Sequence, residues 1–295
     1  IYRSNRLIVA GDEHQMGPTS YFKSGSEEQL SLLHQSNFYL RKVALKHHYR
    51  SKYPELIAFS NMHFYNNELK VFPNYPHTNY AISTHFVENG RFIQRRNEAE
   101  AKKVCELIAK ALKSSQKSIG IVAFSQEQVD CIWETLTEEL KQKFELLIES
   151  NNSFLKPLEK VQGDECAHLI ISLGYGKDEE GNFALRFGPL NQQSGRNRLN
   201  VLFSRASEHI DFVSSIRAED LKMSENESIN LLRNWLRFVE SPKDVAQIEF
   251  PFDIKPVISS NELQFFNIQD ELHSANELVT LHRVLKNRGW KLNYS

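Results

Sequence analysis

Two continuous apolar runs constrain the fold of this chain more than any other feature of its sequence. Residues 118–125 read SIGIVAFS and residues 168–176 read HLIISLGYG, and neither run alternates between polar and apolar side chains. Strands of this kind are buried on both faces, which is typical of parallel sheets that carry helices on both sides. The two runs therefore predict a buried parallel sheet at the centre of the fold.

Helical patterns alternate with the strand patterns along the chain. Pro54 opens one predicted helix, and Asn97 caps a long amphipathic helix that ends near Lys113. Ser125 and Gln128 form a predicted capping box for a further helix, which extends to about residue 143. Together with a helix predicted over residues 196–205, the alternation predicts an α/β fold with a doubly wound parallel sheet. Further strands are predicted at residues 7–12, 81–88 and 210–216.

Composition excludes several classes of protein and leaves others open. The net charge is −1, so there is no global basic field, although local basic patches can still bind nucleic acid. The three cysteines are scattered, and no Cys or His spacing matches a metal-binding motif. We therefore expect no metal site and a reducing, cytoplasmic location. No apolar run reaches the length of a membrane span, so no membrane partner is expected.

Polar residues that suit an anionic ligand flank the predicted strands. Gln15 and Arg50 follow two extended segments, while Gly163 and Glu165 lie in a turn before the run at 168–176. Arg205 ends the apolar segment RLNVLFSR, where a buried guanidinium requires an anionic partner, either a carboxylate of this chain or a ligand. Ligands of doubly wound sheets bind beyond the carboxyl ends of the strands, so we expect these groups at that edge. Two arginines there are typical of a phosphate site.

Five segments, taken in order, resemble the later motifs of superfamily 1 helicases. The resemblance covers about Leu7 to Ile216 and is carried by VAGDEHQMGP, LKHHYRSKYPELIAFSNMHFYNNEL, IGIVAFSQEQ, VQGDECAHLIIS and RLNVLFSRASEHI. The third motif of that family reads Gly-Asp-x-x-Gln-Leu-x-Pro, and residues 11–18 match it with Met16 in place of Leu. The similarity is strongest to the branch that contains the nonsense-mediated-decay RNA helicase and to large bacterial helicases. It implies a RecA-like P-loop NTPase fold.

The resemblance also implies a role for each matching residue. Gln15 would sense the γ-phosphate of ATP and couple it to the nucleic-acid track. Arg50 and Arg205 would contact the γ-phosphate, with Arg205 as the arginine finger. Gly163 and Glu165 would lie beside the nucleotide, with Glu165 near the ribose. The expected partner of Arg205 is therefore ATP.

One further residue is assigned to nucleic acid by the same resemblance. Ser125 stands where relatives carry Thr-Pro-Tyr and would touch the backbone of single-stranded DNA or RNA, although Phe124-Ser125-Gln126 departs from that pattern. The implied activity is ATP hydrolysis coupled to movement along DNA or RNA.

Half of the expected ATP-binding machinery is absent from the sequence. There is no GxxxxGK[ST] motif, which would cradle the phosphates and hold Mg²⁺. We therefore expect residues 1–35 to be the end of a first RecA-like domain and residues 36–220 to be the second. Residues 221–295 are expected to form a helical C-terminal extension. An upstream RecA-like domain of the same polypeptide would supply the P-loop and Mg²⁺, and this chain alone would be inactive.

Two alternatives remain open at this stage. The chain is also compatible with a non-catalytic nucleic-acid-binding or regulatory protein that lost the first domain. The second alternative is a truncated helicase–nuclease fusion. Residues 217–295 contain no Asp with a following Glu-x-Lys set, so no nuclease activity is predicted.

Overall fold

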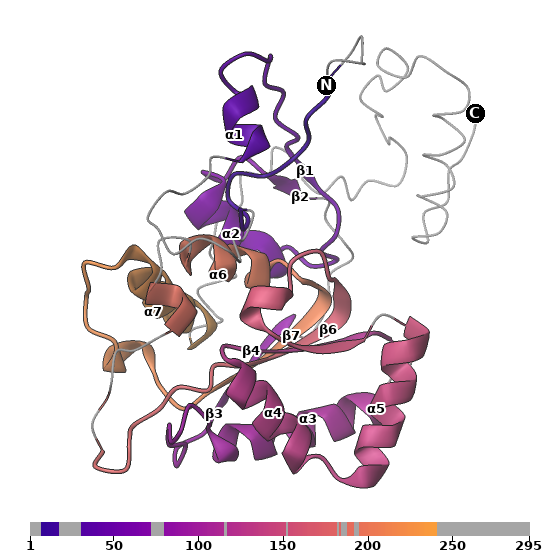
Figure 1. Ribbon diagram of the computed structural model, residues 1–295, viewed down its shortest axis with the longest axis vertical. Helices are drawn as coiled ribbons and strands as arrows, with labels where there is room; N and C mark the ends of the chain where they lie inside the picture. Colours follow the sequence, from indigo (N-terminus) through magenta and orange to yellow (C-terminus); the bar gives the residue numbers. More distant parts are fainter. Residues whose placement is uncertain are drawn as a thin grey trace, which may run out of the picture. The chain divides into compact units, whose positions relative to one another are not determined.

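Five parallel strands form the central sheet of the computed structural model. Their spatial order is β3 (Ile82–Phe86), β7 (Ala206–Ser214), β6 (Cys166–Ser172), β4 (Ile119–Ala123) and β5 (Phe154–Pro157). Every neighbouring pair runs parallel. All residues of β4 are buried, as its unbroken apolar run requires. The predicted α/β fold with a doubly wound parallel sheet is confirmed (Figure 1).

The structure describes most of the chain up to residue 240. The described residues are 7–17, 31–71, 80–114, 117–151, 153–181, 183, 188–191 and 195–240. Most of the predicted C-terminal extension, including everything after residue 240, lies outside the described residues.

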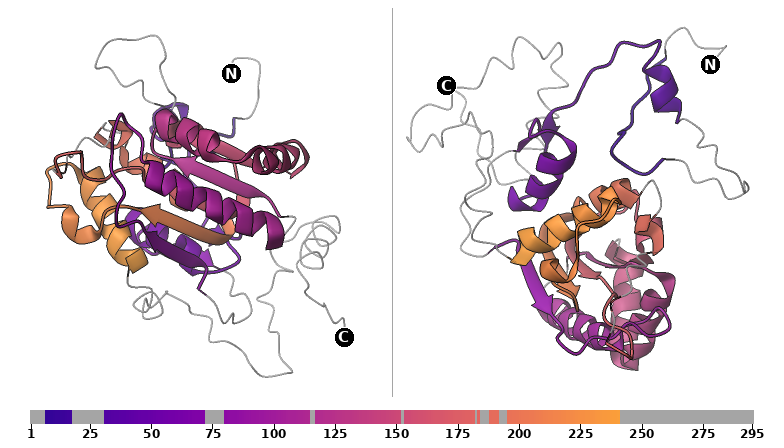
Figure 2. Two further views of the ribbon diagram at one scale, coloured as in Figure 1. Left: turned by 90° about the horizontal axis from the view of Figure 1, so that it is seen from below. Right: turned by 90° about the vertical axis from the view of Figure 1, so that its left-hand side faces the viewer.

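Helices cover both faces of the sheet (Figures 1 and 2). On one face, α3 (Glu98–Ser114), α4 (Gln126–Thr135) and α5 (Glu138–Asn151) pack on a core that includes Ile121 and Ile170. On the other face, the core residues Leu169 and Ile171 pack with three helices. These are α2 (Glu55–Phe64), α6 (Gly195–Phe203) and α7 (Glu227–Glu240). Consecutive residues of one strand thus serve opposite cores, as β-strand alternation dictates.

An aromatic cluster joins these last three helices. Trp235 of α7 is fully buried and stacks on Phe203 of α6, with ring centroids 3.7 Å apart. Phe59 of α2 meets the same indole edge-on at 5.2 Å. Aromatic pairs of this kind contribute stability beyond the burial of apolar area, so they stabilise the packing of α7 against α6 and α2. The first helix after residue 220 therefore packs in the same core as α2 and α6.

The helix predicted from residue 126 to about residue 143 is two helices. Leu136 adopts an extended conformation with ψ 138° and separates α4 from α5. Thr137 then accepts a hydrogen bond from the Leu140 N–H, and Glu138 opens the new helix in a position that favours acidic side chains. The capping box is also half right. The Ser125 hydroxyl accepts the Gln128 N–H at 3.1 Å, but the Gln128 side chain bonds to residues 97 and 172 instead.

The strand predicted at residues 7–12 is wrong. A strand is stabilised by its ladder with a neighbour, and no described strand pairs with these residues. Ile8 is 90% exposed, which a buried strand would not allow. The remaining elements are small: α1 (Leu32–Ser36), the parallel pair β1 (His47–His48) and β2 (Lys70–Val71), and three 3₁₀ turns at Leu158–Lys160, Gly188–Asn191 and Ala218–Asp220.

A buried carboxylate ties the start of α3 to the carboxyl ends of β6 and β7. Glu100 is fully buried, and its Oε2 accepts hydrogen bonds from the Ser172 hydroxyl at 2.8 Å and the Gly174 N–H at 2.7 Å. Its Oε1 accepts one from the Ser215 hydroxyl at 2.8 Å. Burial raises the pKa of Glu100 to about 7, against the opposing effect of these hydrogen bonds.

Replacing Glu100 with glutamine is expected to change how stability depends on pH. A raised pKa in the folded state favours folding below the unfolded pKa, and this contribution is lost as the pH rises through about 7. Between pH 5 and pH 8 the wild-type chain should therefore lose about 2–3 kcal/mol of unfolding free energy relative to Glu100→Gln. Urea denaturation at both pH values measures this difference. Glu106→Gln, on the exposed side of α3, is the control, and parallel stability curves for wild type and Glu100→Gln would contradict the prediction.

Candidate functional site

Two of the predicted arginines meet at Ser204, between α6 and β7. Arg50 donates from Nη1 to the Ser204 carbonyl at 3.3 Å. Arg205 donates from Nη2 to the Ser204 hydroxyl at 3.2 Å. The fold thereby brings together two arginines that lie 155 positions apart in the sequence (205 − 50). We call Arg50, Ser204 and Arg205 the arginine cluster.

Carbonyl oxygens, rather than carboxylates, surround the Arg205 guanidinium. The residue is 2% exposed and donates to the Val201 carbonyl at 2.7 Å and to the Asp164 carbonyl at 3.0 Å. Within the described part of the chain, no carboxylate oxygen forms an ion pair with it inside 4.0 Å. Burial and the nearby Arg50 charge lower the pKa of Arg205 to about 10, so the side chain is still a cation at neutral pH. No carboxylate of the described residues contacts this charge, and Glu165 and Asp164 act on it only at longer range.

The turn before β6 holds both arginines. Gly163 has φ 92°, a left-handed conformation that favours glycine, and the Asp164 N–H closes the turn on the Val161 carbonyl at 3.2 Å. The carboxylate of Glu165, the residue after Asp164, accepts a hydrogen bond from Arg50 Nε at 3.0 Å. The turn therefore presents a carbonyl to Arg205 and a carboxylate to Arg50.

The site lies at the amino ends of the strands, so the prediction of the carboxyl edge is wrong. Glu165 immediately precedes β6 and Arg205 immediately precedes β7. The two strands start in register, and the Cys166 N–H bonds to the Arg205 carbonyl at 3.2 Å. Residues that lead into parallel strands necessarily gather where those strands begin.

A chain of hydrogen bonds leads from Gln15 to α6. Gln15 Nε2 donates to Asp12 Oδ2 at 3.1 Å, and the Tyr65 hydroxyl donates to the same oxygen at 2.7 Å. Asn200 Nδ2 donates to the Tyr65 hydroxyl at 2.9 Å, and its carbonyl accepts the Ser204 N–H. Burial and the hydrogen bond to Asp12 raise the pKa of Tyr65. Gln15 is thus connected to the arginine cluster through three side chains.

Two side chains hold the loop that carries Gln15. Asn197 Nδ2 donates to the Gln15 carbonyl at 2.9 Å, and Gln162 Nε2 donates to the Met16 carbonyl at 3.2 Å. Sequence reasoning did not single out Asn197, Asn200 or Tyr65. The available signal was the i,i+3 pair of asparagines in the helix GRNRLNVLF, because Asn200 is buried there and a buried amide requires partners.

Ser125 is not brought to the arginine cluster. It follows β4, at the carboxyl end of the sheet, whereas the cluster lies at the amino end. Its hydroxyl caps α4 and also donates to the Arg95 carbonyl at 3.2 Å. Both hydrogen-bonding functions of the hydroxyl therefore have partners, and a contact from Ser125 to nucleic acid stays a prediction.

The arrangement is chemically suited to an anion with several oxygens. Arg50 and Arg205 supply planar N–H forks that match phosphate oxygens. The two acidic side chains of the turn are ion-paired, Asp164 with Lys156 at 2.8 Å and Glu165 with Arg50. The described cluster thus offers cationic groups for phosphate.

A family model described as an AAA domain matches residues 26–217, which include both arginines and the turn before β6. The chain belongs to this AAA domain family. Its sequence is 31% identical over 270 residues to an uncharacterized ATP-dependent helicase of Mycoplasma genitalium. The corresponding protein of Mycoplasma pneumoniae is 30% identical over 269 residues. Each match covers 82% of this chain and 24% of the relative, so the chain spans about a quarter of the length of these proteins.

The chain also resembles solved structures, one of which is a helicase domain. The C-terminal domain of a possible DNA helicase from Lactobacillus plantarum aligns with 56% of this chain and 86% of that domain, at 16% identity and a TM-score of 0.28. The family match and the mycoplasma relatives confirm the predicted resemblance to helicases. No helix among the described residues is long and apolar enough to cross a membrane.

Proposed function

We propose that this AAA domain is the C-terminal motor domain of an ATP-dependent superfamily 1 DNA or RNA helicase or translocase. In this proposal it forms one wall of the ATP cleft and supplies Arg205 as the arginine finger. The observation that carries the proposal is the buried Arg205 cation, which has no carboxylate partner in the described part of the chain. Nucleic-acid-stimulated ATP turnover after substitution of Arg205 is the measurement that tests it.

The setting of Arg205 supports the role of a fixed cation. A guanidinium has five N–H donors, and three bonds to Val201, Asp164 and Ser204 orient this one. In the proposal, the remaining donors bind phosphate oxygens. A cation held in this way loses little freedom in the transition state of phosphoryl transfer, where negative charge on the transferring group must be stabilised.

The position of Arg50 supports a second phosphate contact. Its ion pair with Glu165 is partly exposed, and such surface pairs contribute only about 0–1 kcal/mol. A triphosphate can therefore compete for Arg50 at small cost. Glu165, released from that pair, together with Gly163 would then lie beside the nucleotide, with Glu165 near the ribose.

The link from Gln15 supports a coupling role. In the proposal, Gln15 senses the γ-phosphate, and the bonds through Asp12, Tyr65 and Asn200 pass its position to α6. Residues 1–35 are proposed to end the first RecA-like domain, residues 36–220 to form the second, and residues 221–295 to form a C-terminal extension. A P-loop domain of the same polypeptide would hold Mg²⁺ and form the opposite wall of the cleft.

The proposed function predicts salt-sensitive binding of single strands. The protein should bind labelled single-stranded DNA or RNA with an affinity that falls steadily between 50 and 200 mM KCl. Each phosphate contacted adds about −0.7 to the slope of log affinity against log salt. Fluorescence anisotropy measures the slope, and Arg205→Ala, at the opposite edge from Ser125, should leave it unchanged. Binding that ignores salt, or none to any strand, would contradict a motor function.

A further inference from the structure

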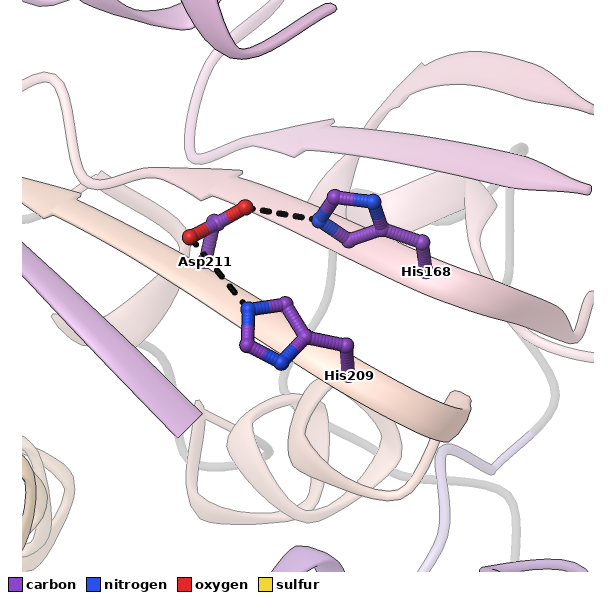
Figure 3. Close-up of side chains that lie close together, drawn as sticks. All are labelled: His168, His209 and Asp211. Carbon is purple, nitrogen blue, oxygen red and sulfur yellow. Dashed lines mark hydrogen bonds and ion pairs between the residues drawn. The ribbon is translucent and has the colours of Figure 1, made fainter. Parts of the chain in front are cut away.

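Three polar side chains with metal-binding chemistry lie together on the sheet. His168 is on β6, and His209 and Asp211 are on β7, where the register places His168 opposite His209. His168 Nε2 lies 2.7 Å from Asp211 Oδ2, and His209 Nε2 lies 3.5 Å from Asp211 Oδ1 (Figure 3). One ligand atom from each residue lies within 4.8 Å of the other two. We call these three residues the His–Asp cluster.

A third imidazole approaches the same carboxylate from the neighbouring strand. His85 of β3 places Nε2 2.7 Å from Asp211 Oδ1. Asp211 is 7% exposed, and no lysine or arginine nitrogen of the described residues forms an ion pair with it within 4.0 Å. Among the described residues, only imidazoles therefore form close polar contacts with the Asp211 carboxylate.

The electrostatics of Asp211 favour a bound cation. Asp211 is nearly buried, and the described side chains that reach its oxygens are those of His168 and His85, both at 2.7 Å, and of His209 at 3.5 Å. A carboxylate taken out of water requires such partners or a bound cation. An imidazole compensates a carboxylate only while it carries a second proton, whereas a divalent cation does so when the imidazoles are neutral.

We propose that the His–Asp cluster is a site for a divalent transition-metal ion of the zinc class. Imidazole nitrogens and carboxylate oxygens are common ligands of Zn²⁺, with bonds of about 2.0–2.2 Å. Tetrahedral geometry at those bond lengths puts neighbouring ligand atoms about 3.3 Å apart. The separation of 3.5 Å between His209 Nε2 and Asp211 Oδ1 fits this spacing. The hydrogen bond of 2.7 Å between His168 and the other carboxylate oxygen, Oδ2, would give way to a bond from His168 to the ion.

The surroundings suit such an ion. The side chains of His168 and His209 are 22% and 31% exposed, so an ion and a water at its fourth position can reach the cluster. Paired parallel strands hold all three ligands, which limits the motion needed on binding. His85 is the positioning residue, since an outer partner of a ligating carboxylate fixes its orientation.

The site is separate from the arginine cluster. Asp211 points to the side of the sheet that Ile170 and Val213 share with α3 and α4, while Ile210 and Phe212 serve the other core. A bound ion would join β6 to β7. The proposal therefore predicts a stability effect and is independent of ATP turnover, so the two proposals can fail separately.

Cobalt(II) titration of the metal-free 295-residue chain tests this site. Co²⁺ should bind in a 1:1 ratio, give the intense visible absorption of a four-coordinate ion, and be displaced by Zn²⁺. Free Zn²⁺ at about a hundred times its dissociation constant should raise the melting temperature by about 5–10 °C. Absence of uptake by the wild-type chain would overturn the proposal.

Four variants assign the binding to these residues. His209→Gln and Asp211→Asn should abolish both the absorption and the thermal shift, while His85→Gln should weaken affinity about 10–100-fold and keep the absorption. His34→Gln, an exposed histidine of α1, is the control and should bind as wild type does. Circular dichroism checks each fold, and if Asp211→Asn does not fold, His209→Gln alone decides. Binding that survives His209→Gln would overturn the assignment.

Discussion

Replacing Arg205 with alanine is expected to lower ATP turnover at least about a thousandfold when the chain acts with the proposed P-loop domain. Arginine fingers contribute factors of about 10³–10⁵ to phosphoryl transfer. The charge that Arg205 would neutralise grows in the transition state, so turnover should fall far more than ATP affinity. Steady-state phosphate release in the presence of single-stranded DNA or RNA measures the first quantity, and equilibrium nucleotide binding measures the second.

Matched variants separate charge loss from damage to the fold. Arg50→Ala should also impair turnover, because Arg50 lies across Ser204 from Arg205. Arg237→Ala removes an exposed arginine of α7 and should leave turnover unchanged. Arg205 anchors the turn before β6 through the Asp164 carbonyl, so thermal unfolding of each variant must accompany the assay. Arg205→Gln retains hydrogen-bond donors without the charge. Turnover near the wild-type value in a folded Arg205→Ala or Arg205→Gln protein would remove the finger assignment.

The sheet and most of its helices could be predicted because their signals are local. The apolar runs at residues 119–123 and 169–171, within β4 and β6, do not alternate with polar residues, so burial in a parallel sheet was the available solution. Asn97 accepts the Glu100 N–H at 3.1 Å and opens α3 where the sequence placed the helix. Local caps and patterns act within a few residues, which a single sequence displays directly.

Features that depend on a distant partner could not be predicted in the same way. Residues 7–12 read as a strand, yet a strand also needs a neighbour, and none of the described strands pairs with them. The Gln128 side chain was assigned to Ser125 but bonds to Asn97 and Ser172, which approach only in the folded sheet. The helical pattern is continuous near residue 136, so it did not predict that the backbone of Leu136 would be extended and would separate two helices.

The sequence did not predict correctly at which edge of the sheet the candidate residues lie. Arg50, Glu165 and Arg205 do meet, but at the amino ends of β6 and β7. The sequence prediction followed the general rule that ligands of doubly wound sheets bind at the carboxyl edge. It did not take into account that Glu165 and Arg205 each precede a strand and therefore lie at the amino edge. The sequence did not predict the His–Asp cluster, because His168 and Asp211 are brought together by the pairing of two parallel strands and not by a short spacing in the sequence.

The chain on its own is expected to hydrolyse no ATP above background. Its two arginines can stabilise a γ-phosphate only when other groups hold the nucleotide and direct the attacking water. A P-loop with its bound Mg²⁺ performs that positioning in enzymes of this class, and the 295 residues contain no GxxxxGK[ST] motif. Nucleotide affinity should also be weak, since only Arg50, Glu165 and Arg205 would face the ligand.

Adding the P-loop domain separates missing machinery from an inactive protein. Supplied in one polypeptide with this chain, that domain should restore ATP turnover that single-stranded DNA or RNA stimulates, and Arg205→Ala should abolish the gain. A P-loop variant with its lysine replaced by alanine is the matched control, because it keeps the domain contact and loses phosphate binding. If the isolated chain hydrolyses ATP in proportion to its concentration, and Arg205→Ala removes that activity, the phosphate-binding half of the site must lie within these 295 residues. The division of the cleft between two domains would then be wrong.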